Sequence, residues 1–150
     1  MPTRGETNRA PWRVTLVGPC AAGKTTLETL LRAHGVAAHA VAQEHSHVPY
    51  LWQLSRPDAL IFLNLRLSTL RARRGASWTR GLLDAQRIRL AHAHAHAHLR
   101  LATDNEPPSA SADRILAFLR AHDPAVLPRP ADPALLRAFR RSALDPRSEP

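Results

Sequence analysis

Residues 14–25 read VTLVGPCAAGKT, and this segment determines which fold class the chain can adopt. Its first four residues form a short apolar run that Gly18-Pro19 ends, as is typical of a buried parallel strand. From Lys24 onward the apolar residues recur at helical spacing, namely Leu27, Leu30 and Leu31. Gly35 then ends the pattern as a helix C-cap does. The segment therefore predicts a strand, a loop and a helix.

The loop within this segment fits GxxxxGK[ST] at every fixed position between the predicted strand and helix. Glycines allow backbone N–H groups to converge on phosphate oxygens, and the helix N-terminus adds its dipole. The ammonium of Lys24, the only lysine, neutralises β/γ charge, and the Thr25 hydroxyl can ligate Mg²⁺. The alternative is a glycine-rich turn with an exposed lysine. The expected phosphate-binding residues are Gly18, Ala21, Ala22, Gly23, Lys24, Thr25 and Thr26.

Strands and helices are expected to alternate along the rest of the chain. Further strands are predicted at residues 36–42, at 58–64, where the run is apolar enough to be central, and at 99–103. The predicted helices are a short one capped by Ser68 and ending at Arg74, a long one over residues 81–98, and a last one capped by Ser109 or Ser111. This alternation predicts a parallel sheet covered by helices on both faces, with ligands at the carboxyl ends of the strands.

The length of 150 residues indicates one folded domain, expected over residues 12–122. Residues 1–11 are expected to form a flexible arm, and residues 123–150 a proline-rich tail with room for one short helix. A single cysteine and the lack of a long apolar run predict a cytoplasmic protein that does not enter a membrane. The net charge of +9 is consistent with nucleic acid, a membrane surface or polyphosphate as partner, or with solvated arginines alone.

With the phosphate loop in place, the chain resembles the small P-loop kinases of the nucleoside monophosphate kinase and thymidylate kinase type. The resemblance covers roughly residues 12–121, and beyond the loop it rests on the strand at 57–64 and the arginine-bearing segment that follows. It implies a P-loop NTPase fold, an α/β three-layer α/β/α sandwich with a parallel sheet of four to five strands. It also implies binding of ATP with Mg²⁺ and transfer of the γ-phosphoryl group to a small-molecule or nucleotide acceptor.

Three site residues follow from the resemblance. The segment LRARR at residues 70–74 resembles the arginine-rich lid of such kinases, so Arg71 and Arg74 are expected to neutralise transition-state charge. The family needs an acid near the magnesium, and Glu44 follows the second predicted strand, at the same sheet edge as the loop. Glu44 is therefore expected to orient Mg²⁺ with Thr25, or to accept the substrate proton as the Glu of the Glu-Arg-Ser motif of deoxynucleoside kinases does, although His45 replaces the arginine here. The alternatives are exposed arginines on a helix and a surface carboxylate.

Other parts of the chain depart from the kinase pattern. The stretch 45–56 is too short for the usual helices that bind a nucleoside monophosphate, so the acceptor is unidentified. Four residues there are candidates to line an acceptor pocket: His45, His47, Tyr50 and Trp52. The alternative for Tyr50 and Trp52 is packing on the sheet. The resemblance also places residues 103–105 beside the adenine. Two other functions stay open, a nucleotide-binding regulatory protein without catalysis and a basic nucleic-acid-binding accessory protein.

Four histidines alternate with alanine at His92, His94, His96 and His98. On a helix they form two i, i+4 pairs on opposite faces, whereas a strand brings all four to one side. We expect them to belong to a helix, with a transition-metal site as the alternative.

Overall fold

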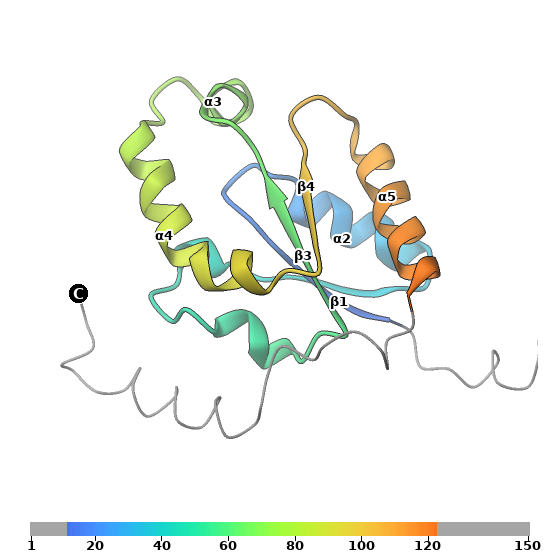
Figure 1. The fold of residues 1–150 in the computed structure, drawn as a ribbon. Helices are drawn as coiled ribbons and strands as arrows, with labels where there is room; N and C mark the ends of the chain where they lie inside the picture. Colours follow the sequence, from blue (N-terminus) through green and yellow to red (C-terminus); the bar gives the residue numbers. More distant parts are fainter. Residues whose placement is uncertain (1–11, 123–150) are drawn as a thin grey trace, which may run out of the picture.

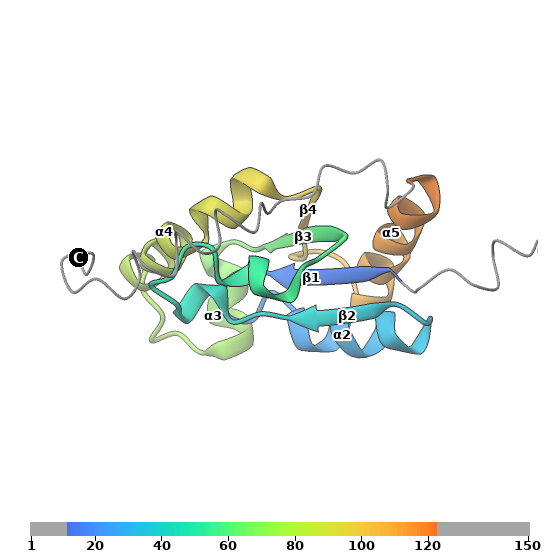
Figure 2. The same ribbon diagram turned by 90° about the horizontal axis from the view of Figure 1, so that it is seen from below.

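A parallel sheet lies at the centre of the computed structural model, which describes residues 12–122. The predicted arm at 1–11 and tail at 123–150 lie outside these residues. In the described part the strands are β1 (Arg13–Val17), β2 (Ala37–Ala40), β3 (Ala59–Asn64) and β4 (Leu99–Ala102). Their order is β2-β1-β3-β4, as Figure 2 shows, so β1 and β3 are the two central strands. The predicted parallel sheet is confirmed, with four strands.

Helices cover both faces of this sheet (Figure 1). The helices α2 (Lys24–Ala33) and α5 (Pro108–Ala121) pack on one face. The helix α4 (Arg80–His96) packs on the other face with the 3-10 turn η2 (Leu51–Ser55). The short helix α3 (Leu67–Arg74) follows β3, and the 3-10 turn η1 (Gln43–His45) follows β2. The fold is therefore α/β, with an all-parallel sheet between two helical layers.

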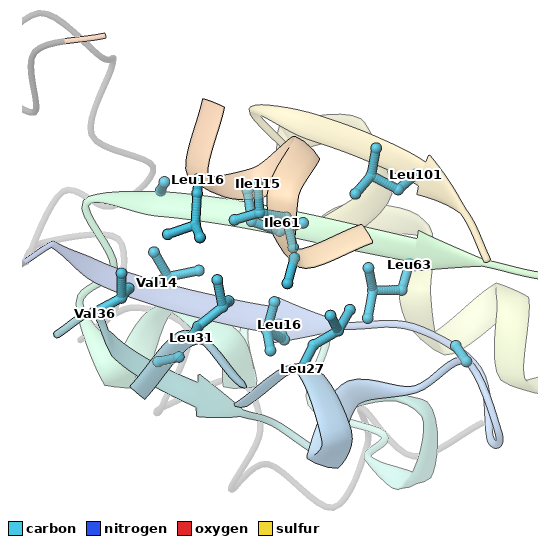
Figure 3. Packing of buried hydrophobic residues seen from close by; sticks show 14 of the residues in the cluster. Val14, Leu16, Leu27, Leu31, Val36, Ile61, Leu63, Leu101, Ile115 and Leu116 are labelled. Carbon is cyan, nitrogen blue, oxygen red and sulfur yellow. The ribbon is translucent and has the colours of Figure 1, made fainter. Parts of the chain in front are cut away.

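The core follows from the alternation of side chains along the strands. Ile61 and Leu63 of β3 point to the face covered by α2 and α5, where Figure 3 shows them beside Leu16, Leu27 and Ile115. The intervening residues of β3 belong to a second cluster on the opposite face, which contains Val17, Trp52, Leu60, Phe62, Leu90 and Ala93. A strand buried on both faces explains why residues 59–63 form an unbroken apolar run.

The structure corrects two predicted helix caps. Ser68 lies inside α3, and the first turn of that helix is instead held by Asp104, whose Oδ1 accepts hydrogen bonds from Arg66 N at 2.8 Å and Thr69 Oγ1 at 2.5 Å. The last helix starts at Pro108, so neither Ser109 nor Ser111 caps it. Proline suits this first helical position because its fixed φ matches the helix and because an N–H at this position would have no partner within the helix.

The long helix also ends two residues earlier than predicted, at His96. His98 therefore leaves the helix, and its backbone N–H donates to Leu60 O at 2.8 Å beside β3. The expected pairing of His92 with His96 on one helix face is confirmed, whereas His94 and His98 do not share a helix. No helix within residues 12–122 has the length and apolar character needed to span a bilayer.

Candidate functional site

The loop between β1 and α2 curls tightly beside β3. A Cβ on Gly18 would lie 2.2 Å from Leu63 O, so only glycine allows the chain to leave β1 this close to the neighbouring strand. The N–H of Ala22 then donates to Pro19 O at 3.2 Å, which closes a turn. Gly23 has a φ of 99°, a left-handed conformation that brings the chain directly into α2. The predicted strand, loop and helix are thus confirmed, and the loop is curled.

The N-terminus of α2 opens this loop toward anions. The first-turn amides of a helix have no partner within the helix, and Gly23, which precedes α2, has no side chain with which to cap them. The first turn of α2 also contains no acidic residue. Unpaired amides and the positive end of the helix dipole together favour phosphate or carboxylate at this point.

A cleft of about 640 Å³ lies against the loop, at the carboxyl ends of the strands. Its size falls in the range of about 300–1,000 Å³ that is usual for small-molecule sites. The residues that line it come from four segments: 20–27, 42–45, 73–74 and 103–111. These include Glu44 and six of the seven expected phosphate-binding residues, all except Gly18. Because the chain leaves β1 toward β2 and leaves β3 toward β4, the cleft sits where ligands bind in open parallel sheets.

Lys24 and Glu44 meet in this cleft. The Lys24 ammonium forms an ion pair with Glu44 Oε2 and also donates to Gly18 O at 2.6 Å and to Pro19 O at 3.1 Å. Glu44 is 3% exposed and Lys24 is 12% exposed, so water screens the pair weakly. Arg89 of α4 donates to Glu44 O at 3.2 Å and helps to fix the turn η1. The sheet thus brings together a lysine and a glutamate twenty residues apart.

The second carboxylate oxygen of Glu44 is unpaired among residues 12–122. Among the described residues, Glu44 Oε1 is buried from water and makes no hydrogen bond. An unpaired buried oxygen is costly unless a ligand or cation occupies the space in front of it. Thr25 lines the same cleft, so a hydroxyl and a carboxylate, both oxygen ligands that Mg²⁺ prefers, are available together. The residues present therefore fit a magnesium ion.

The arginines of α3 are arranged differently from the sequence prediction. Arg74 lines the cleft as expected, but Arg71 lies in a separate hollow and donates to Trp78 O at 2.7 Å. The arginine that reaches the loop between β1 and α2 is Arg73, which donates to Ala21 O at 2.7 Å and to Thr103 O at 2.5 Å. Arg71 and Arg74 are three residues apart, but the structure places them at different sites.

The segment after β4 forms another side of the cleft. Thr103 is buried there and its hydroxyl donates to Ala22 O at 2.9 Å, whereas Asp104 is turned toward α3 and Asn105 is exposed. Burial alone raises the pKa of Asp104, but the hydrogen bonds from Arg66 and Thr69 and the Arg66 charge outweigh it and lower the pKa.

Two cleft residues in this segment were not predicted to be functional. Within the described chain, Glu106 Oε1 and Ser111 Oγ are buried without a hydrogen-bond partner, and both residues line the cleft. The sequence contains no signal for Glu106 and Ser111, because neither belongs to a motif and their place in the cleft depends on how α5 packs on the sheet.

Of the four residues considered for an acceptor pocket, one lines the cleft, two pack together elsewhere, and His47 is exposed outside the cleft. His45 lines the cleft. Trp52 is completely buried against the sheet and donates from Nε1 to His92 Nδ1 at 3.1 Å, and Tyr50 makes an edge contact with the same imidazole at a ring distance of 3.9 Å. Desolvation and the neighbouring His96 lower the pKa of His92 to about 4. The histidine run is therefore partly a packing element.

Comparison of the chain with protein-family models, with curated proteins and with solved structures gives no match.

Proposed function

We propose that the protein is a small P-loop kinase, of the nucleoside monophosphate kinase and thymidylate kinase type, which binds ATP with Mg²⁺ in the cleft and transfers the γ-phosphoryl group to a small acceptor. One observation carries the proposal. The curled loop at the start of α2 opens into a cleft that also holds Lys24, Glu44 and Arg74. This is the set of groups that phosphoryl transfer requires, namely an anion cradle, a mobile cation, a metal-binding acid and a guanidinium.

The Lys24 ammonium is bound within the loop, next to the N-terminus of α2. It is bound to two loop carbonyls and to Glu44, all of them acceptors that phosphate oxygens can replace. A triphosphate lying on the loop amides draws the ammonium toward the β- and γ-phosphates, and Glu44 is then released to act on a cation. The contacts of Lys24 thus support a role as the phosphate-binding lysine of the motif.

Mg²⁺ would be held by the Thr25 hydroxyl and Glu44, and when bound it supplies charge that neutralises the transferring phosphoryl group. Glu44 either ligates the ion directly or through water. Arg73, already bound to the loop at Ala21 O, adds a second guanidinium beside Arg74 where charge develops. Transfer is therefore driven by positioning and electrostatics, as is general for phosphoryl transfer.

The acceptor is proposed to be small. The segment between β2 and β3 is taken up by η1 and η2, and Trp52 fixes η2 against the sheet, so this segment packs as part of the core. Two polar residues of this segment, Glu44 and His45, line the cleft. An acceptor hydroxyl placed next to Glu44 can pass its proton to the carboxylate during transfer.

The proposal is tested with ATP labelled in the γ-phosphate and a panel of nucleosides, nucleoside monophosphates and small alcohols. Transfer to one acceptor class is expected, lowered at least tenfold in Arg73→Gln and in Arg74→Gln. Arg71→Gln is the matched control, because it removes the same charge from the same helix outside the cleft. Binding of ATP without transfer to any acceptor would instead support the nucleotide-binding regulatory protein.

A further inference from the structure

We propose that Cys20, His45 and Glu44 form a binding site for a thiophilic divalent transition metal, with Zn²⁺ as the representative ion. Cys20 Sγ lies 3.3 Å from His45 Nε2. One ligand atom from each of the three residues lies within 4.8 Å of the others. Thiolate, imidazole and carboxylate are the ligand types that Zn²⁺ uses in proteins.

The spacing is close to that of a tetrahedral site. With Zn–S near 2.3 Å and Zn–N near 2.05 Å, a tetrahedral angle sets the sulfur and nitrogen about 3.6 Å apart. The observed 3.3 Å between Cys20 and His45 needs an opening of only a few tenths of an ångström. The Glu44 carboxylate lies within 4.8 Å of the other two ligand atoms, and its Oε1 is the buried oxygen for which the described residues provide no hydrogen-bond partner.

Side chains of α4 bind Cys20 and Glu44, two of the three proposed ligands. The backbone N–H of Cys20 donates to Gln86 Oε1 at 3.0 Å, and Gln86 Nε2 donates to Cys20 Sγ at 3.1 Å. Gln86 is 4% exposed, and a buried amide that makes both bonds fixes the position of the sulfur. Arg89, one turn further along α4, holds the backbone of Glu44. Outer contacts of this kind orient ligands and strengthen metal sites.

This site shares Glu44 with the proposed magnesium site but differs from it in the other ligands. Sulfur and imidazole are poor ligands for Mg²⁺ and good ones for Zn²⁺, so Cys20 and His45 select for the transition metal. Binding converts the Cys20 thiol to a thiolate, and its proton passes to solvent. The three protein ligands leave one position for water or a phosphate oxygen. The inference does not rest on the kinase proposal, which assigns no role to the Cys20 sulfur.

The histidines of α4 are the main competitor for an added metal. The rings of His92 and His96 stack at 4.1 Å. Their inner nitrogens are engaged, however, since His92 Nδ1 accepts from Trp52 and His96 Nδ1 lies 2.8 Å from His92 O. Within residues 12–122, Cys20, Glu44 and His45 are the group of three with metal-binding spacing. A signal that reports only a metal–sulfur bond therefore distinguishes binding at Cys20 from binding at the histidines of α4.

Titration of the full chain with Co²⁺ under reducing conditions supplies that signal. Because Cys20 is the only cysteine of the 150 residues, a thiolate-to-cobalt charge-transfer band in the near ultraviolet reports this site alone. We expect the band to saturate at one equivalent, with visible bands of tetrahedral cobalt, and to be displaced by Zn²⁺ but not by Mg²⁺. His45→Ala is expected to weaken binding at least tenfold, and His92→Ala is the control that leaves it unchanged.

The proposal is overturned if no charge-transfer band forms, or if His45→Ala leaves the band and its affinity unaltered. A measurement on the unmodified chain guards against variants that fail to fold. Zn²⁺ should slow alkylation of the Cys20 thiol by a maleimide at least tenfold, and Mg²⁺ should not. An alkylation rate that Zn²⁺ does not change would also contradict the site.

Discussion

Replacing Gly18 with alanine is expected to destabilise the protein by about 2–4 kcal/mol. The added Cβ lies 2.2 Å from Leu63 O, and real Cβ contacts almost never fall below 3.0 Å, so β1 and β3 must separate locally by about 0.8 Å. Overpacking of this kind costs roughly 1–3 kcal/mol. Opening a backbone hydrogen bond by that distance forfeits about another 1 kcal/mol.

Gly35→Ala is the matched control for this experiment. Gly35 also has a positive φ, of 81°, but nothing lies within 4 Å of its added Cβ. Gly35→Ala should therefore lower the free energy of unfolding only by the cost of placing alanine in left-handed backbone, about 1–2 kcal/mol. Urea unfolding followed by circular dichroism gives both free energies of unfolding. If Gly18→Ala and Gly35→Ala lose the same stability, the close approach of the loop to β3 is not a constraint and the reasoning is refuted.

Three further predictions concern other parts of the molecule. Folding lowers the pKa of His92 from 6.5 to about 4, so between these pH values the unfolded chain binds the proton and the folded chain does not. The free energy of unfolding should therefore drop by roughly 1–2 kcal/mol from pH 6.5 to pH 4, after allowance for solvent screening. His92→Gln should flatten this part of the pH profile, and an unchanged profile would contradict the lowering of the His92 pKa by burial and by His96. Asp104→Ala should cost about 0.5–2 kcal/mol in urea unfolding because α3 loses its N-terminal acceptor. Folding lowers the pKa of Asp104 from 3.8, so this cost should be full above pH 3.8 and should shrink as the pH falls from 3.8 through the lower folded-state pKa; a cost that does not shrink with falling pH would oppose this account. Ser111→Ala should leave the free protein as stable or slightly more so, since its buried hydroxyl has no partner within the described residues, and a loss above about 1 kcal/mol would show a missed hydrogen bond.

The central elements of the fold could be predicted because local pattern and tertiary context agree there. Residues 14–17 and 59–63 are apolar runs, and the structure buries both as adjacent strands. The loop between β1 and α2 was predictable from its glycines, since its left-handed turn at Gly23 excludes most other residues. These features are set within a dozen residues of sequence.

Helix caps were less predictable because they depend on contacts from distant segments. Asp104 holds the start of α3 across 38 residues, and no local rule pointed to it. The serine at Ser68 satisfied the local preference for capping, but the aspartate is a stronger acceptor and takes its place. In α5 the preference of Pro108 for the first helical position prevailed over the nearby serines.

The site was predictable in its loop and less so in its surroundings. Sequence placed Glu44 at the same sheet edge as Lys24, and the structure brings the two into contact. Sequence could not decide which arginine of α3 turns to the cleft, because Arg71, Arg73 and Arg74 all lie on one short helix whose rotation is set by packing. The contact of Cys20 with His45 was likewise missed, since the cysteine occupies a variable position of the loop motif.

The most direct test of the account is calorimetric titration of the protein with ATP in the presence and absence of Mg²⁺. Wild-type protein should bind one ATP, more tightly with Mg²⁺. Lys24→Ala with Glu44→Gln, a pair that leaves no unpaired buried charge, should bind at least tenfold more weakly, corresponding to about 1.4 kcal/mol or more. Equal affinity of the wild-type and double-variant proteins for ATP, or no binding by either, would contradict the proposed nucleotide site.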